Sequence, residues 1–269
     1  MKCSRLIAAL LLVHLLATPG QAETLRFVLD DYCPYYCKDS SQNTPQLAEL
    51  PGYVVEILQY TFSQPNERLE FEFHPWERGL HGTNRGKFTG IIMAAKNEAP
   101  DLLFSRHEQG RSVGCYYGKP TNPWRYNGID SVSQVHLLLI NGYQYGEPLN
   151  SYLLDPARVE NRQVAYLSGN FPLMRIFQML QRDRGDATMD DRAVADYELY
   201  RLGLQKEFIN LGCSEGIMDF YVGFSPVHKN AQALADRLSA AMDELRASGQ
   251  LDKILAKYGM TDWRNQPTN

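Results

Sequence analysis

Residues 221–259, YVGFSPVHKNAQALADRLSAAMDELRASGQLDKILAKYG, carry the pattern that most constrains the fold. An apolar strand runs directly into an amphipathic helix, and a Ser-Gly break at 248–249 separates that helix from a second short one. The apolar residues of the first helix recur at helical spacing and form one stripe: Leu234, Leu238, Ala241 and Leu245. Gly259 is placed to cap the second helix. The pattern predicts a terminal helix pair that docks onto a sheet.

The N-terminus has the composition of a secretory signal peptide. Lys2 and Arg5 precede an apolar run from Leu6 to Ala17, and Gly20-Gln21-Ala22 forms a cleavage site of the small-x-small type. A membrane anchor is the alternative, but the apolar run is well short of the roughly 20 residues that span a bilayer. We therefore expect a signal peptide at 1–22 and a periplasmic protein that does not insert into the membrane after cleavage.

The composition argues against several classes of partner. The chain of 269 residues has a formal net charge of −4, and removing Lys2 and Arg5 changes it from −4 to −6. No run of Lys or Arg is present, which argues against nucleic acid and anionic membranes. Neither a phosphate-binding loop nor histidines at metal-ligand spacing occur, so we expect no cofactor and no metal. The mature length suits one large domain or two small lobes, and we expect a monomer.

Four cysteines follow the signal peptide: Cys33, Cys37, Cys115 and Cys213. An even number in an oxidising compartment favours disulfides. Cys33-Pro-Tyr-Tyr-Cys37 suits a small local loop, which leaves Cys115 to pair with Cys213, but four cysteines permit three pairings and the sequence does not select among them. A zinc site or a redox pair is disfavoured because the spacing is not C-x-x-C.

Strand and helix patterns alternate through the first part of the mature chain. Alternating apolar residues predict strands at 25–29 and 69–73, and a continuous apolar run predicts a third strand at 89–93. Helices are expected from Tyr53 to Phe62 and from Pro75 to about Arg85. This βαβαβ order predicts an α/β unit with right-handed crossovers.

A second α/β unit follows a loop-rich region at 118–133, which we interpret as a linker or hinge. Strands are expected at 135–140, 163–167, 187–189, 208–211 and 220–224, and helices after Pro148, at 171–182 and from Asp190 or Asp191 to Leu199. We expect lobe 1 to comprise 23–118 and 219–269, and lobe 2 to comprise 119–218. A Cys115–Cys213 bridge would lie near both crossings between the lobes.

Several short segments strengthen this interpretation by their order and spacing. They are Gly52 to Ile57, Pro75-Trp76-Glu77-Arg78, Gly86 to Ile92, Phe104-Ser105, Gly142-Tyr143-Gln144-Tyr145-Gly146 and Arg184 to Asp191. Together with the tail they resemble family 3 extracytoplasmic solute-binding proteins, the periplasmic receptors of polar amino acid ABC transporters. The resemblance implies an α/β, type II periplasmic-binding-protein fold, in which two lobes close over a ligand cleft by hinge bending.

The resemblance also implies how an amino acid would be held. In amino-acid binders of the family, an Arg of the first lobe holds the ligand carboxylate and an Asp after a second-lobe strand holds the α-ammonium. That Asp corresponds to Asp191, which reads equally well as a helix N-cap. The Arg position holds Glu98, and a carboxylate repels another carboxylate. A standard α-amino acid ligand is therefore placed in question.

Other residues are candidates for the ligand site. Arg78 and Arg106 lie near the ends of expected strands and are candidates for the cation that would bind a ligand carboxylate in place of the family's Arg. Arg78 is also consistent with a solvated helix face. Aromatic residues in the loops expected at the cleft edge would stack on a ring or cover a cation, unless they are ordinary loop packing: Tyr32, Tyr35, Trp76 and Tyr143. Acidic residues outnumber basic ones here, which favours a positively charged ligand: Asp30, Asp31, Glu98, Asp190 and Asp191.

We expect a receptor that captures a small polar molecule for the permease of an ABC transporter. A ligand-sensing protein that docks to a membrane signalling receptor is the main alternative, and the sequence does not separate the two. An enzyme similar to the cyclohexadienyl dehydratases is disfavoured, because that reaction needs a positioned acid and cationic groups for the substrate carboxylates.

Overall fold

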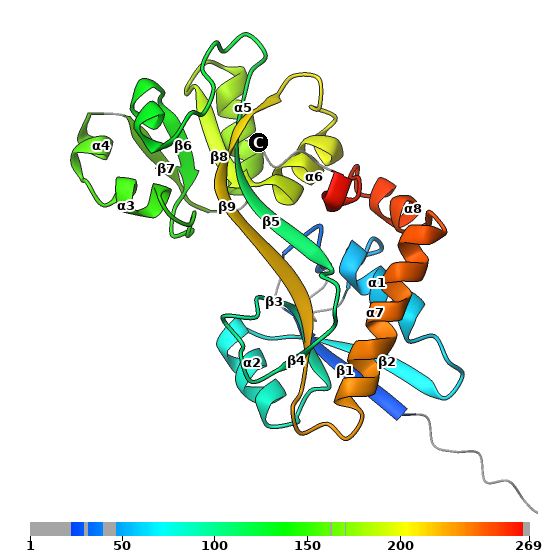
Figure 1. Cartoon of the computed structure of the whole chain (residues 1–269). Helices are drawn as coiled ribbons and strands as arrows, with labels where there is room; N and C mark the ends of the chain where they lie inside the picture. Colours follow the sequence, from blue (N-terminus) through cyan, green and yellow to red (C-terminus); the bar gives the residue numbers. More distant parts are fainter. Residues whose placement is uncertain (1–22, 30–31, 40–46, 162, 170, 266–269) are drawn as a thin grey trace, which may run out of the picture.

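The computed structural model describes residues 23–29, 32–39, 47–161, 163–169 and 171–265. The expected signal peptide, 1–22, and the acidic residues Asp30 and Asp31 lie outside the described residues. The described chain forms two α/β lobes that are joined by two long neighbouring strands (Figure 1). None of the described helices has the length and apolar composition that crossing a bilayer requires.

Lobe 1 begins with the βαβαβ unit that the sequence predicts. The strands are β1 (Glu23–Leu29), β2 (Glu67–Phe73) and β3 (Gly90–Ala94), and the connecting helices are α1 (Tyr53–Thr61) and α2 (Trp76–Asn84). β1 pairs in parallel with both β2 and β3. Parallel neighbours need a crossover, which the two helices provide.

The C-terminal segment completes lobe 1. Strand β9 (Ile209–Phe224) pairs antiparallel with β3, and the short β4 (Leu103–Phe104) pairs with β9 as well. Helices α7 (Ala231–Ala247) and α8 (Gln250–Ala256) follow. The stripe of α7 is buried, with Leu234, Leu238 and Leu245 in one cluster with residues of α1 and β1. The prediction of a terminal helix pair that docks on the sheet is confirmed.

Lobe 2 has helices on both faces of its part of the sheet. Its strands are β5 (Gly110–Gly118), β6 (Leu137–Ile140), β7 (Val164–Leu167) and β8 (Ala187–Asp191). Its helices are α3 (Leu149–Leu153), α4 (Ala157–Glu160), α5 (Pro172–Gln181) and α6 (Arg192–Leu202). The strand order through both lobes is β2-β1-β3-β9-β5-β8-β6-β7, so β9 belongs to the sheets of both lobes.

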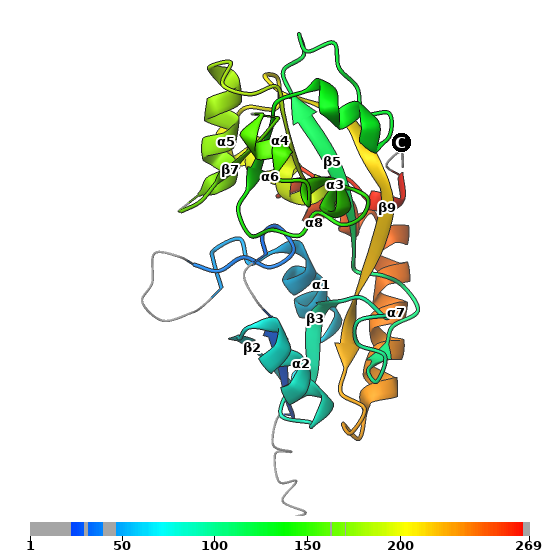
Figure 2. The same ribbon diagram turned by 90° about the vertical axis from the view of Figure 1, so that its left-hand side faces the viewer.

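The connection between the lobes differs from the prediction in two ways. β9 is one strand of 16 residues, where the sequence predicts two separate strands, and β5 was not predicted as a strand. The loop at 118–133 is not the hinge, because Trp124 and Val132 within it are buried in the core of lobe 2. The crossings are β5 and β9 themselves (Figure 2).

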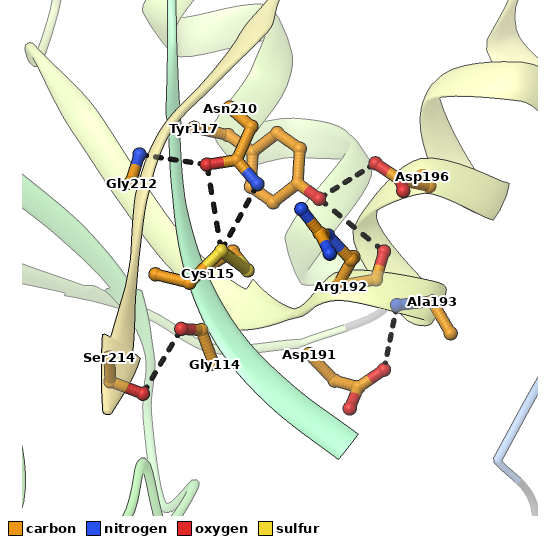
Figure 3. The surroundings of a disulfide bond; sticks show 11 residues. Gly114, Cys115, Tyr117, Asp191, Arg192, Ala193, Asp196, Asn210, Gly212 and Ser214 are labelled. Carbon is orange, nitrogen blue, oxygen red and sulfur yellow. Dashed lines mark hydrogen bonds between the residues drawn. A yellow bond between two sulfur atoms is a disulfide. The ribbon is translucent and has the colours of Figure 1, made fainter. Parts of the chain in front are cut away.

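Two disulfides join the four cysteines of the described residues. Cys33 is bonded to Cys37, and Cys115 is bonded to Cys213. The second bridge links the crossing strands, since Cys115 on β5 lies opposite Cys213 on β9 (Figure 3). It thus fixes the register of the two strands where they enter lobe 2.

Candidate functional site

A cavity of about 570 Å³ lies between the lobes. Lobe 1 contributes Tyr32, Glu98 and the lobe 1 end of β9 at Phe220. Lobe 2 contributes the loop Tyr143 to Glu147, Asn150 and the end of β8. A second cavity of about 650 Å³ adjoins it on the lobe 1 side, and the two share Tyr32, Glu98 and Phe220. We take this pair of cavities, called the cleft below, as the candidate ligand site.

The chain brings polar groups to the cleft where strands of lobe 2 end. β6 and β8 are parallel neighbours, and each ends beside the cavity. Asp190 and Asp191 are the last residues of β8, and the loop that contains Tyr143 follows β6. Ligands of α/β proteins bind outside the carboxyl ends of such strands, so this position is the expected one for a site.

An irregularity in the crossing strands shapes the cleft floor. The pair Val113–Ile217 is followed by the pair Cys115–Cys213, so β9 uses residues 214–216 where β5 uses Gly114 alone. Ser214, Gly216 and Gly114 all line the cavity, and the Ser214 hydroxyl donates a 3.1 Å hydrogen bond to the Gly114 carbonyl (Figure 3). Bulges of this kind redirect side chains and occur often beside functional sites.

Asp191 serves both as a helix cap and as part of the cavity wall. Its Oδ1 accepts a 2.9 Å hydrogen bond from the backbone N–H of Ala193 (Figure 3). It accepts a second one from the N–H of Val194 at 3.2 Å, and the two together cap α6. The interpretation of Asp191 as a helix N-cap is therefore confirmed, and the residue also lines the cavity. Burial raises the pKa of Asp191 to about 6, against the opposing effect of Ser112, Tyr35 and the capping N–H groups.

Asp190 is buried next to it. Its Oδ1 accepts a 2.7 Å hydrogen bond from the backbone N–H of Asp191. Burial raises the pKa of Asp190 to about 7, and the nearby charges of Asp191 and Glu198 add to the rise. In both aspartates Oδ2 is buried and lacks a hydrogen-bond partner of good geometry among the described residues, although the Ser112 hydroxyl lies close enough to influence Asp191. Unpaired buried oxygens of this kind are rare and call for an explanation.

The predicted aromatic residues occupy different positions in this site. Tyr32, Tyr143 and Trp76 line the cleft, Trp76 in the adjoining cavity. Tyr35 is fully buried behind it, with its ring stacked on Tyr32 at a centroid distance of 5.3 Å. Its hydroxyl donates a 3.1 Å hydrogen bond to Asp191 Oδ1, so Tyr35 supports the carboxylate. It is not among the residues that line the cavity, in contrast to the expectation from the sequence.

The two predicted cations do not line the cleft. Arg106 pairs with Asp243 of α7 at 2.6 Å, because the strand end that precedes it points toward that helix. Arg78 lies exposed on α2 and is absent from the described lining of both cavities. Among the described residues that line either cavity, none is Lys, Arg or His. Arg78 and Arg106, the candidates for the missing cation, are therefore not among the described residues that line the cleft.

Glu98 lines both cavities, and the other lining residues include several that sequence reasoning missed. The missed residues are Ser112, Gly114, Ser214, Met218, Glu147 and Asn150. Most of them lie on β5 and β9, where the bulge interrupts the alternation that marks a strand. The pairing of Cys115 with Cys213 was the available signal, since a disulfide between two segments places them side by side.

Neither a family model nor a curated protein matches the sequence. Solved structures match at low identity over most of the chain. The L-cystine solute receptor of Neisseria gonorrhoeae, in its unliganded open conformation, matches with a TM-score of 0.62 and 18% identity, over 90% of this chain and 95% of that chain. A probable amino-acid ABC transporter extracellular-binding protein of Bacillus subtilis matches with a TM-score of 0.60 and 16% identity, over 88% and 98%.

A histidine kinase sensor domain with similarity to periplasmic binding proteins matches with a TM-score of 0.56 and 17% identity, over 88% of this chain and 96% of that chain. Matches at this level of identity establish the fold. The chain has the two-lobed type II periplasmic-binding-protein fold, as the sequence predicts. The family resemblance is supported at the level of the fold.

Proposed function

We propose that this protein is a periplasmic receptor that captures a small polar molecule between its lobes and presents it to a membrane partner. One observation carries the proposal above the others. Asp190 and Asp191 are buried in the wall of an interlobe cavity, and each keeps one carboxylate oxygen without a hydrogen-bond partner among the described residues. A buried acceptor without a partner destabilises a protein, so such oxygens are retained where a ligand supplies the donor.

The architecture supports capture by closure. The lobes are connected by two strands, and a ligand between them would contact both lobes at once. Domain closure around such a ligand is the general mechanism of two-lobed receptors. The fold neighbours support a partner in the membrane, since two are named as an ABC-transporter binding protein and a kinase sensor domain.

Sensing is the second candidate function. The match to a histidine kinase sensor domain favours it, and the cleft would serve either role. Genes for a permease and an ATPase beside this gene would support transport. A neighbouring sensor kinase or cyclic-dinucleotide enzyme would support sensing.

A dehydratase-like enzyme is less well supported. Elimination of water and carbon dioxide from a dicarboxylate needs cationic groups for the carboxylates. The described lining residues include no Lys, Arg or His. An assay that detected turnover of prephenate or arogenate would reverse this conclusion.

A thermal-shift panel on the oxidised, exported protein tests the proposed function. The panel includes the standard amino acids, diamines and polyamines, quaternary amines, opines and aromatic acids. A ligand at 100 times its dissociation constant stabilises the native state by about 2.7 kcal/mol. For a chain of this size the melting temperature then rises by roughly 5–10 °C. The absence of a shift with every class would count against a solute receptor.

A further inference from the structure

Both lobes contribute acidic side chains to the cleft. Glu98, Glu147, Asp190 and Asp191 line the interlobe cavity of about 570 Å³, and Glu77 joins Glu98 in the adjoining one. The described lining contains no basic side chain to balance them. A ligand carboxylate would therefore lose its hydration without gaining a counter-charge, which is strongly unfavourable.

Three basic groups of the strands and loops around the cleft are engaged in other interactions. Arg111 of β5 pairs with Asp219 of β9 at 2.8 Å. Lys96 lies over the ring of Tyr221, with its Nζ 4.1 Å from the ring centroid. Arg106 is held by Asp243 on α7, as described above. The interactions of these three groups would have to be broken before any of them reached a ligand carboxylate.

The buried aspartates are a second, independent indication of a cationic ligand. Asp190 and Asp191 are 4% and 7% exposed, and Oδ2 of each lacks a hydrogen-bond partner of good geometry among the described residues. These oxygens accept hydrogen bonds and cannot donate them while the carboxylates are ionised. An ammonium group forms charge-assisted hydrogen bonds with such acceptors, about twice as strong as neutral ones.

The acidic groups are distributed along the cleft. Asp190 and Asp191 lie in lobe 2, Glu98 lies where the two cavities meet, and Glu77 lies in the lobe 1 cavity. Tyr32 and Phe220 line both cavities. The apolar chain of a ligand would pack against these rings, and an ammonium group of the ligand would contact their aromatic faces. The arrangement suits positive charges separated by an apolar chain.

We propose, on the premise that the protein is a solute receptor, that its ligand is a linear organic cation with at least two protonated nitrogens and no carboxylate. Diamines and polyamines have this chemistry. One nitrogen binds at Asp190 and Asp191, and a second binds at Glu98. The lobes close because the ligand neutralises carboxylates of both.

Isothermal titration with matched pairs tests this inference. Putrescine is compared with ornithine, cadaverine with lysine, and agmatine with arginine, because each pair differs only by the α-carboxylate. We expect each amine that binds to do so at least about tenfold more tightly than its amino acid, a difference of about 1.4 kcal/mol. An amino acid that binds as tightly as its amine overturns the inference and leaves the receptor function in place. If no amine binds while the broad panel finds another ligand, the inference again fails alone; if no compound binds at all, both proposals fail.

Matched variants locate the site. Asp190→Asn and Glu98→Gln each remove one charge from the cleft, and Asp101→Asn removes one from an exposed position outside the described lining of both cavities. We expect amine affinity to fall at least about tenfold in the first two variants and to be unchanged in the third. Glu98 is exposed, so Glu98→Gln remains a test if Asp190→Asn does not fold. Folded cleft variants that bind the amine as the wild type does would overturn the assignment.

Discussion

The hydroxyl of Tyr35 lies 3.1 Å from Asp191 Oδ1 and thereby connects lobe 1 to lobe 2 behind the cleft. The same hydroxyl lies 2.8 Å from the carbonyl oxygen of Arg111 on the crossing strand β5. A tyrosine hydroxyl has one hydrogen, so it shares that hydrogen between two acceptors unless Asp191 is itself protonated. The protonation of Asp191 and the contact between the lobes are consequently coupled.

Replacing Tyr35 by Phe removes this connection. We expect Tyr35→Phe to lower the free energy of unfolding by about 1–2 kcal/mol, because a buried carboxylate and a carbonyl lose a hydrogen-bond donor. Urea unfolding measures the change. Tyr60→Phe is the control, since the Tyr60 hydroxyl also donates to a carboxylate, Glu244 Oε1 at 2.8 Å, but on the surface. Equal effects of the two substitutions would contradict the role of Tyr35 in joining the lobes.

Stability without ligand should depend on pH through Asp190. Its pKa is raised to about 7 in the folded protein, so the unfolded chain releases the proton at lower pH than the folded one. The folded state then binds more protons, and the free energy of unfolding falls as pH rises from about 4 to about 7. Besides burial, the charges of Asp191 and Glu198 raise the pKa of Asp190, whereas hydrogen bonds from Ser112 and Tyr35 oppose the rise in the pKa of Asp191.

Asp190→Asn tests this pH dependence. We expect the variant to be more stable than the wild type at pH 8, by about 2 kcal/mol, because it no longer buries an unpaired charge. The decrease in the free energy of unfolding between pH 5 and pH 8 should be smaller in the variant than in the wild type. Burial acts to raise the pKa of Glu108, but hydrogen bonds from Arg264 and Trp263 lower it to about 2. Glu108 therefore stays ionised in the folded protein between pH 5 and pH 8 and does not contribute to the pH dependence measured there. A variant that is less stable than the wild type at pH 8 would show that Asp190 is a structural residue.

The disulfide between the crossing strands should stabilise lobe 2 and the cleft floor together. Cys115 and Cys213 enclose most of lobe 2, and Cys213 directly precedes the bulge at 214–216. We expect the Cys115→Ala/Cys213→Ala variant to lose about 2–4 kcal/mol. Thermal melts measure the loss of stability, and ligand titrations measure the effect on ligand affinity. If the melting temperature and the affinity are both as in the wild type, the bridge does not hold the bulge in place.

Gly52 permits the close contact between α1 and the loop of Tyr35. Its φ is +102°, and a Cβ atom there would lie 2.3 Å from the Cα of Tyr36 and 2.5 Å from the Tyr35 carbonyl oxygen. Gly52→Ala therefore displaces backbone and not merely a side chain, and we expect a loss of at least about 2 kcal/mol. Gly203→Ala is the control, because φ is +70° there but no atom lies within 4 Å of the added Cβ. Comparable melting temperatures of the two variants would contradict the packing argument.

Local patterns were sufficient to predict most of the fold. The stripe on α7, the alternating residues of β1 and β2, and the cap at Asp191 each depend on neighbours in the sequence, and each is confirmed. β5 and β9 were not predicted correctly, because they cross between lobes and carry a bulge at 214–216. The order of apolar and polar residues in β5 and β9 depends on strands that are distant in the sequence. A search for alternating residues within a short segment therefore does not detect these two strands.

The candidate site was predicted only in part for a related reason. Glu98, Asp190 and Asp191 were identified from sequence and line the cleft. Arg106 was misplaced because its partner, Asp243, lies 137 residues further along the chain. Such distant pairings hold Arg106 and Arg111 away from the described lining of the cleft, and local sequence does not report them.

In the proposed complex, the buried carboxylates of the cleft bind a cation between the lobes. A crystal structure of the protein with the amine that stabilises it most tests this directly. We expect closed lobes and an ammonium nitrogen about 2.7–3.2 Å from a carboxylate oxygen of Asp190 or Asp191. A ligand carboxylate in the cleft, or an amine bound only outside it, would contradict the proposed binding mode.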